Sequence, residues 1–133
     1  MKTVIVTGGL GYIGSHTVVE LLNEGYEVVV LDNLSNSSES VIDGIRAITK
    51  KSLHFFNVDL RDYDKLEAAI GYYQQSIVGV IHFAACKSVG ESMKNPSKYY
   101  DNNVAGTNNL LMAMKEYHVG NLIFSSSCTV YGE

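Results

Sequence analysis

The stretch that decides the fold runs from residue 3 to residue 14 and reads Thr-Val-Ile-Val-Thr-Gly-Gly-Leu-Gly-Tyr-Ile-Gly. Its first five residues form a β-branched run, which is typical of a strand buried on both faces of a sheet. Glycines stand at positions 8, 11 and 14, and a segment with helical periodicity extends from Tyr12 to Glu24. A glycine-rich turn between a strand and a helix is a common binding place for a phosphate group.

The three glycines have different expected roles in this turn. Gly8 permits a tight turn, Gly11 removes the Cβ that would block a pyrophosphate, and Gly14 allows the helix to pack closely on the sheet. The N–H groups of Tyr12 and Ile13 would then point at the phosphates, helped by the helix dipole. A purely structural turn could also use such glycines, but the position between a strand and a helix favours phosphate binding.

The rest of the chain alternates between strand-like and helix-like segments. Further strands are predicted at 28–31, 53–58, 78–84 and 122–124, and further helices at 38–50, from Asp62 to about residue 73, and at 95–118. Strands alternating with helices imply right-handed βαβ units, so the predicted fold class is α/β. We expect a Rossmann-type doubly wound parallel sheet in three αβα layers, with strand order 3-2-1-4-5. In the helix at 38–50, the side chains expected to point inward are Val41, Ile42, Ile45 and Ile48.

Asp32 stands at the end of the second predicted strand, 18 residues after Gly14. A carboxylate at this position accepts hydrogen bonds from the adenosine ribose hydroxyls and repels a 2′-phosphate, so NAD is predicted in preference to NADP. The alternative is a turn residue at the end of a strand, because Asp followed by Asn is common in loops. The spacing from the glycine turn favours the ribose contact.

Composition and charge narrow the class of protein. The 133 residues are 46% apolar and suit one globular domain, and the formal net charge of -4 gives no basic footprint for nucleic acid or membrane. The apolar runs are too short to cross a bilayer. Cys86 and Cys128 show neither metal-ligand spacing nor a disulfide pattern, so we expect free thiols in a reducing cytoplasm. His16 and His82 lack ligand partners, so packing roles and no metal are expected.

Several further motifs are specific enough to indicate a family. They are TGGLGYIGSH at 7–16, LDNLSN at 31–36, VIHFAA at 80–85 with Lys87, VGES at 89–92, YYDNNV at 99–104, and FSSS at 124–127 with TVYG at 129–132. Together they resemble extended short-chain dehydrogenases/reductases, and among these the UDP-hexose (UDP-glucose/UDP-galactose) 4-epimerases. The resemblance covers essentially the whole chain. It departs from the family pattern at Ala85-Cys86, where epimerases usually have Gly-Leu, and this difference could change how tightly the cofactor is held.

The resemblance implies a set of cofactor contacts. The pyrophosphate would lie on the turn formed by Gly8, Gly11, Tyr12, Ile13 and Gly14. The adenosine ribose would be surrounded by Asp32, Asn33, Leu34, Ser35, Asn36 and Ser37, and the adenine would meet Asp59 and the Leu60 backbone. The nicotinamide half would be lined by Phe83, Ala84, Ala85 and Cys86, and Lys87 would reach the nicotinamide ribose. Asn102 would hydrogen-bond near the cofactor, and Ser127 would bind the sugar 4-hydroxyl and help position the proton transfer.

Some of these positions have ordinary structural alternatives. Asp59 could equally be a capping or loop carboxylate, and Phe83 could be an ordinary buried strand residue. A lone surface lysine such as Lys87 is usually solvated, and Ser127 could be a turn serine at a strand end. For the Asn residues between 101 and 109 a local polar role is favoured, because Asn competes for backbone hydrogen bonds inside a helix.

The resemblance implies an isomerase of galactose metabolism that interconverts UDP-galactose and UDP-glucose by transient oxidation at sugar C4. In this family a Tyr in a Y-x-x-x-K motif removes the 4-hydroxyl proton while hydride passes to NAD. No Tyr in this sequence has Lys four residues later. We therefore expect residues 1–133 to be an incomplete NAD-binding Rossmann domain, without the substrate domain and inactive alone. The alternatives are another nucleotide-sugar enzyme, such as a dehydratase or decarboxylase, and a non-catalytic nucleotide-binding module.

The helix predicted at 95–118 carries two apolar faces. One face has Tyr100, Val104 and Leu111, and the other has Tyr99, Gly106, Leu110, Ala113 and Tyr117. We expect one face to pack on the sheet and the other to meet a second subunit, which predicts a homodimer of the full-length enzyme. The alternative is that C-terminal segments outside these residues cover the second face. A charge at Leu110 or Ala113 is expected to disturb that association.

Overall fold

The computed structural model describes residues 2–34, 38–83 and 96–125, apart from the side chains of 96–104 and 125. Its strands are β1 (Thr3–Thr7), β2 (Glu27–Asp32), β3 (His54–Asn57), β4 (Ile77–Phe83) and β5 (Leu122–Ser125). Its helices are α1 (Tyr12–Asn23), α2 (Ser40–Thr49), α3 (Tyr63–Tyr72) and α5 (Pro96–Glu116). The predicted alternation of strands and helices is confirmed, with boundaries that differ by at most two residues.

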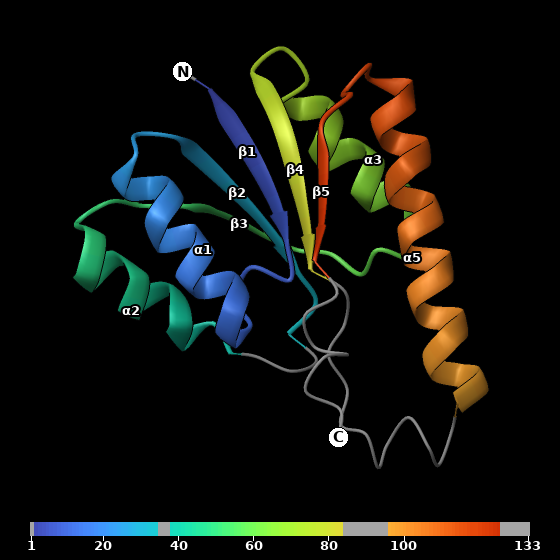
Figure 1. Ribbon diagram of the computed structural model, residues 1–133, viewed down its shortest axis with the longest axis horizontal. Coiled ribbons are helices and arrows are strands. Elements are labelled where there is room, and N and C mark those ends of the chain that lie inside the picture. Colours follow the sequence, from blue (N-terminus) through green and yellow to red (C-terminus); the bar gives the residue numbers. More distant parts are fainter. Residues whose placement is uncertain (1, 35–37, 84–95, 126–133) are drawn as a thin grey trace.

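The strands form one parallel sheet in the order β3-β2-β1-β4-β5, as predicted. In its register Thr7 pairs with Leu31 and with His82, and Asp32 pairs with Asn57. The carboxyl ends of the central strands therefore meet at one edge of the sheet, which lies at the lower centre of Figure 1. Ligands of open parallel α/β sheets bind outside this edge.

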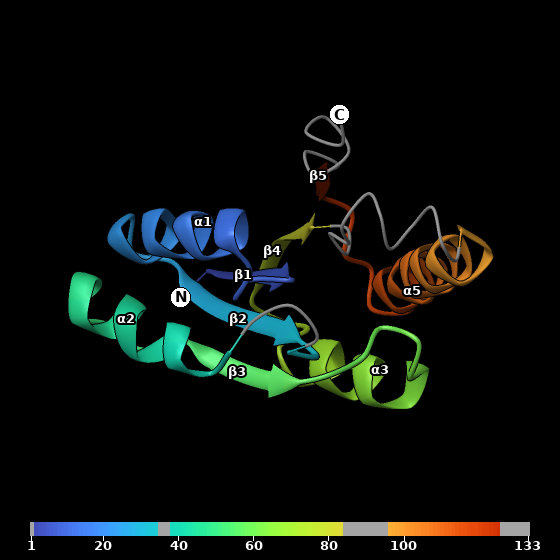
Figure 2. The ribbon, with the colours of Figure 1, turned by 90° about the horizontal axis from the view of Figure 1, so that it is seen from below.

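Alternating residues of the central strands divide the core into two layers. Val28 and Val30 of β2 pack in one cluster with side chains of α1 and α2, including Val18, Leu22 and Ile45. Val29 and Leu31 of the same strand pack in a second cluster with side chains of α3 and α5, including Leu66, Ile70 and Leu110. Figures 1 and 2 show these two helix pairs on opposite faces of the sheet. The three-layer αβα architecture is thus confirmed.

Local signals place two helix ends where the sequence predicts them. The Asp62 side chain accepts a hydrogen bond from the Lys65 N–H at 3.3 Å and caps α3. Gly25 follows α1 with φ 93°, a left-handed conformation that favours glycine. In α2 the expected inward position of Ile48 is wrong, because this side chain is 69% exposed. The buried stripe of α2 instead continues from Ile45 to Thr49, four residues later.

The expected partner-facing positions on α5 are also wrong. Leu110 and Ala113 have no exposed surface and pack in the cluster shared with α3 and the sheet. Leu111 and Met112, which follow on the outer side, are 44% and 55% exposed. The face that contains Leu110 is therefore the sheet-facing side of α5, and a charge there would disrupt the core.

Candidate nucleotide-binding site

Two of the three predicted glycines are required by the packing of the turn between β1 and α1. Gly8 has φ 69°, and a Cβ on it would lie 3.2 Å from the Phe83 carbonyl oxygen. A Cβ on Gly14 would lie 2.3 Å from the Gly8 carbonyl oxygen, which no rearrangement of side chains could relieve. Gly14 therefore lets α1 pack directly on the glycine turn, at the amino end of the helix.

Gly11 is different, because nothing among the described residues requires a glycine at this position. Its φ of -72° and ψ of 174° suit any residue, and a Cβ would meet only the Gly8 carbonyl oxygen, at an ordinary 3.5 Å. Gly11 caps α1 without a side-chain hydrogen bond, and Tyr12 behind it is 82% exposed. The space beside Gly11 thus lies at a helix start, where the first N–H groups have no hydrogen-bond partner within the helix. This arrangement suits an anion held by backbone donors.

Gly9 is a position in the turn that the sequence motif did not single out. A Cβ on Gly9 would lie 2.9 Å from Cγ1 of Val30 and 3.3 Å from Cγ1 of Val6. The glycine is therefore required for close packing of the turn over β1 and β2. The Gly-Gly doublet was visible in the sequence, but its reason depends on which strand lies beside β1.

Asp32 ties the glycine turn to the end of β2. Its side chain is buried, with Oδ2 accepting from the Leu10 N–H at 3.1 Å and Oδ1 accepting from the Leu34 N–H at 2.7 Å. The strand-end turn role considered for Asp32 is thus real. The same bonds hold the carboxylate beside the turn, which is where a ribose contact requires it. A carboxylate oxygen can accept more than one hydrogen bond.

Asp59 forms a compact charged cluster at the end of β3. Its carboxylate accepts from Arg61 Nη2 at 2.6 Å, from Arg61 Nε at 3.0 Å and 3.2 Å, and from the Arg61 backbone N–H at 2.9 Å. These hydrogen bonds, with a further one from the Asn33 side chain, lower the pKa of Asp59 to about 2. Asp59 is therefore ionised near neutral pH. Arg61, its partner, was not among the predicted site residues.

Leu60 is held from the other side by α5. The Asn109 side chain donates from Nδ2 to the Leu60 carbonyl oxygen at 2.8 Å. A Cβ on Gly106 would lie 3.1 Å from the Leu60 Cβ, so the helix approaches this loop closely. The local polar role predicted for the Asn residues of this helix is confirmed at Asn109.

His82 is a packing residue, as predicted, and it also joins three elements through hydrogen bonds. Its Nδ1 lies 2.5 Å from Oγ1 of Thr7 on β1, and its Nε2 lies 3.1 Å from Oγ1 of Thr107 on α5. Burial lowers the pKa of His82 to about 4, so the ring is neutral at pH 7. His16, by contrast, is exposed and lies edge-on to Tyr12, with ring centroids 5.0 Å apart. Across the part of the chain that the structure describes, no group of His, Cys, Asp and Glu could hold a metal ion.

The remaining predicted site residues divide into two groups. Phe83 ends β4 half-buried, packed against the cluster on the α1 face of the sheet. The others lie outside the described residues: Ser35, Asn36, Ser37, Ala84, Ala85, Cys86, Lys87, Ser127 and the side chain of Asn102. The described residues therefore bring together the pyrophosphate and adenosine parts of the predicted site.

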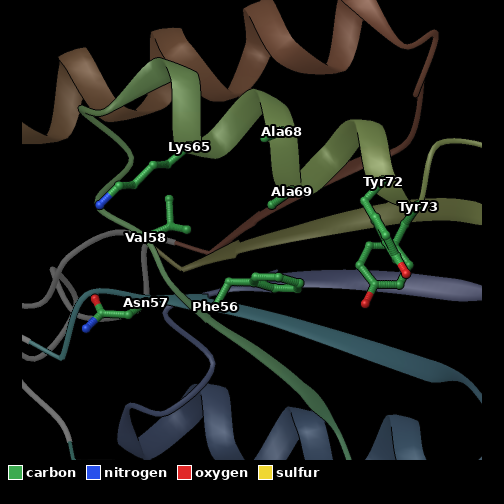
Figure 3. A pocket seen from close by; sticks show the side chains of 8 residues that line it. All are labelled: Phe56, Asn57, Val58, Lys65, Ala68, Ala69, Tyr72 and Tyr73. Atoms are coloured by element: carbon green, nitrogen blue, oxygen red, sulfur yellow. The ribbon is translucent and has the colours of Figure 1, made fainter.

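A separate hollow of about 550 Å³ lies between β3 and α3. Figure 3 shows an apolar floor of Phe56, Val58 and Ala69, with Tyr72 and Tyr73 at one end. The remaining lining residues are Asn57, Lys65 and Ala68. None of the predicted cofactor residues lines this hollow, so the candidate site stays at the carboxyl edge of the central strands. None of the helices that the structure describes combines the length and hydropathy needed to cross a membrane.

A parallel αβα sheet with a glycine turn after β1 and a carboxylate after β2 defines the Rossmann class of nucleotide-binding domains. Within this class, the chain belongs to the NAD dependent epimerase/dehydratase family, which it matches over residues 4–133.

Individual relatives agree with this family membership. The chain is 54% identical to the UDP-glucose 4-epimerase of Bacillus subtilis over 129 residues, which are 97% of this chain and 38% of that protein. It is 56% identical over 133 residues to the bifunctional protein GAL10 of Pachysolen tannophilus, covering all of this chain and 19% of the relative. The chain thus spans 19% to 38% of the length of these curated relatives.

Solved structures of UDP-glucose 4-epimerases also resemble this chain in fold and sequence. The UDP-glucose-4-epimerase of Stenotrophomonas maltophila, with bound NAD and formylated UDP-arabinopyranose, superposes with a TM-score of 0.88 at 48% identity. The UDP-glucose 4-epimerase of Bifidobacterium longum, in complex with NAD+ and UDP, also gives 0.88, at 46% identity. Each comparison covers 98% of this chain and 38% of the other.

Proposed function

We propose that this chain supplies the NAD-binding part of a UDP-glucose 4-epimerase that interconverts UDP-galactose and UDP-glucose. The observation that carries the proposal is Gly11. No described neighbour requires a glycine there, whereas a Cβ would fill the space where the start of α1 can receive a pyrophosphate. Relatives at 48% and 46% identity are epimerases whose structures contain NAD, which supports the same cofactor here.

The described residues fit NAD in two places. The turn from Gly8 to Gly14 would hold the pyrophosphate through backbone N–H groups, and Asp32 would accept hydrogen bonds from the adenosine ribose. When bound, NAD supplies a reversible hydride acceptor for oxidation at sugar C4. The contribution of this chain is to orient the cofactor, because the backbone bonds to Asp32 fix the carboxylate before binding occurs.

Cofactor titration tests the first part of this proposal. NAD should bind this chain more tightly than NADP, since the Asp32 carboxylate repels a 2′-phosphate. Gly11→Val should lower the NAD affinity at least about tenfold, because the branched side chain displaces the pyrophosphate from its donors. Gly120→Val is the matched control, because a Cβ at Gly120 meets nothing within 4 Å. Undiminished NAD binding by folded Gly11→Val would show that phosphate is not held at this turn.

We also propose that residues 1–133 alone do not convert UDP-galactose. No Tyr is followed by Lys four residues later, so the proton-transfer pair of the family is not encoded in this stretch. Loss of general-base catalysis typically lowers a rate by about a hundred- to ten-thousand-fold, and the loss of substrate positioning adds to it. Turnover of UDP-galactose by the 133 residues with saturating NAD would refute this part. A longer chain that includes the Tyr and Lys is the positive control, and a dehydrated or decarboxylated product from it would favour the related nucleotide-sugar enzymes.

The homodimer of the longer enzyme remains part of the proposal, with its contact moved to the outer side of α5. Leu111 and Met112 are the exposed apolar side chains there, at 44% and 55%. Met112→Glu in the longer protein should weaken association in a sedimentation experiment, whereas Lys115→Glu on the exposed surface of the same helix should have less effect. Unchanged sedimentation of Met112→Glu would remove this face from the interface.

A further inference from the structure

We propose that Asp59 and Arg61 form a second specificity element, which favours NAD over NADP by holding the Arg61 guanidinium away from a 2′-phosphate. This inference rests on the NAD binding proposed above. It assigns to Asp59 a role through its neighbour Arg61, in addition to any contact that Asp59 makes with adenine.

The position of the pair in the sheet places it next to the strand end that carries Asp32, the residue proposed above to bind the adenosine ribose. Strands β2 and β3 are parallel and end in register, with Asp32 paired to Asn57. Asn33, the residue after Asp32, donates from its side chain to Asp59, two residues after Asn57. The Asp59–Arg61 pair is thus linked to the strand end that carries Asp32.

The geometry of the pair shows how firmly the guanidinium is held. Two nitrogens of the Arg61 side chain approach both carboxylate oxygens of Asp59, with the shortest distance 2.6 Å. The Arg61 backbone N–H adds a bond to Oδ1 at 2.9 Å, which fixes the turn between the two residues. Planar guanidinium groups prefer such two-point contacts with carboxylates and phosphates alike.

The same geometry makes Arg61 a potential phosphate ligand. Its side chain is 51% exposed, so a guanidinium released from Asp59 would be accessible to a phosphate on the adjacent ribose. With Asp59 ionised, the pair carries no net charge and the guanidinium donors that face the carboxylate are occupied. The discrimination against NADP would thus come both from repulsion by Asp32 and from sequestration of the nearby cation.

A ratio of affinities isolates this effect. NAD and NADP share the adenine, so a lost adenine contact cancels when the two dissociation constants are divided. Asp59→Asn keeps the size of the side chain and an oxygen that can accept the Arg61 backbone N–H in the turn. It removes the negative charge that holds the Arg61 guanidinium. We expect the ratio of NADP to NAD dissociation constants to fall about five- to tenfold, because a half-exposed cation and phosphate interact modestly through water.

Two further variants separate the effect of the Arg61 guanidinium on this ratio from the effect of losing a negative charge. Asp59→Asn combined with Arg61→Gln should return the ratio to the wild-type value, because no guanidinium remains to bind the phosphate. Asp64→Asn on α3 removes one carboxylate in the first turn of that helix and should leave the ratio unchanged. Raising the salt concentration should reduce the effect of Asp59→Asn, since a charge pair at this exposure is screened.

The outcomes distinguish this inference from the proposed function. If the wild-type chain binds neither cofactor, the proposed NAD site fails. If it binds NAD, but Asp59→Asn leaves the ratio unchanged, the role of Arg61 is refuted. A double variant that keeps the altered ratio refutes it too, because the effect would then come from the Asp59 charge alone.

Discussion

Lowering the pH from 7 to 5 should destabilise this fold through one buried ring, that of His82. The ring is 4% exposed, and both of its nitrogens lie within hydrogen-bond distance of threonine hydroxyls. Burial depresses its pKa from 6.5 to about 4. The unfolded chain therefore takes up a proton between these two values while the native protein does not, so stability falls as the pH falls through this window.

The size of the effect follows from the two pKa values. The pKa of His82 is 6.5 in the unfolded chain and about 4 in the folded protein. A pH change across this whole interval would lower the free energy of unfolding by about 3 kcal/mol. Between pH 7 and pH 5 roughly two thirds of it, about 2 kcal/mol, should be lost from the free energy of unfolding. Glu27 and Asp59, whose pKa values are lowered in the folded protein, affect stability at lower pH. Their contributions to the free energy of unfolding are lost as the pH falls below the ordinary values of 4.5 and 3.8.

Urea unfolding at pH 7, 6 and 5, followed by circular dichroism, measures this slope. His82→Phe should unfold more easily at pH 7, because Thr7 and Thr107 lose a partner, but its stability should change much less with pH. His16→Gln, at an exposed position, is the control and should keep the wild-type slope. A wild-type slope in His82→Phe would show that another group takes up the proton, and the reasoning would be wrong.

Three further predictions concern packing, capping and alkaline stability. Gly14→Ala should cost about 1–3 kcal/mol in urea unfolding, because its Cβ would lie 2.3 Å from backbone oxygen, whereas Gly44→Ala, in open space on α2, should not destabilise. Asp62→Ala should cost about 1 kcal/mol by the same measurement, because α3 loses its cap, and an unchanged midpoint would contradict that role. The bond from Tyr117 to Glu67 raises the Tyr117 pKa to about 12, so the native state keeps the proton and stability is lost as pH rises from 10 to 12. Tyr117→Phe should reduce this alkaline loss, and an identical loss in the variant would exclude Tyr117 as its source.

Most of the fold could be predicted from the sequence because local and global signals agree. The β-branched run at 3–7 and the glycines after it specify a strand, a turn and a helix, and the parallel order follows from their repetition. The prediction failed where the burial of a helix face depends on its neighbours. Ile48 and Ile45 have similar sequence environments, but only Ile45 meets the sheet cluster.

The sequence predicted the parts of the candidate site that depend on backbone conformation and strand position. Gly8 and Gly14 are needed for reasons that the motif implies, and Asp32 takes its position from the strand that carries it. Arg61 was missed because an arginine two residues after an aspartate is ordinary in loops. Its significance depends on a side-chain rotamer that only the folded chain shows. The role of Gly9 was likewise hidden, since Val30 becomes its neighbour only through the β1–β2 pairing.

The sheet order also has a consequence in time. β1 lies between β2 and β4, and its pairing with β4 joins Thr3 to Ile77 and Thr7 to His82. During synthesis, β2 is complete at Asp32, whereas β4 is complete only at Phe83. At a ribosomal rate of about 5–20 residues per second, this leaves one edge of an apolar strand unpaired for about 3 to 10 seconds. In that interval the nascent chain presents an unpaired sheet edge to other chains. Rapid pairing of β4 with β1 therefore protects the chain against aggregation.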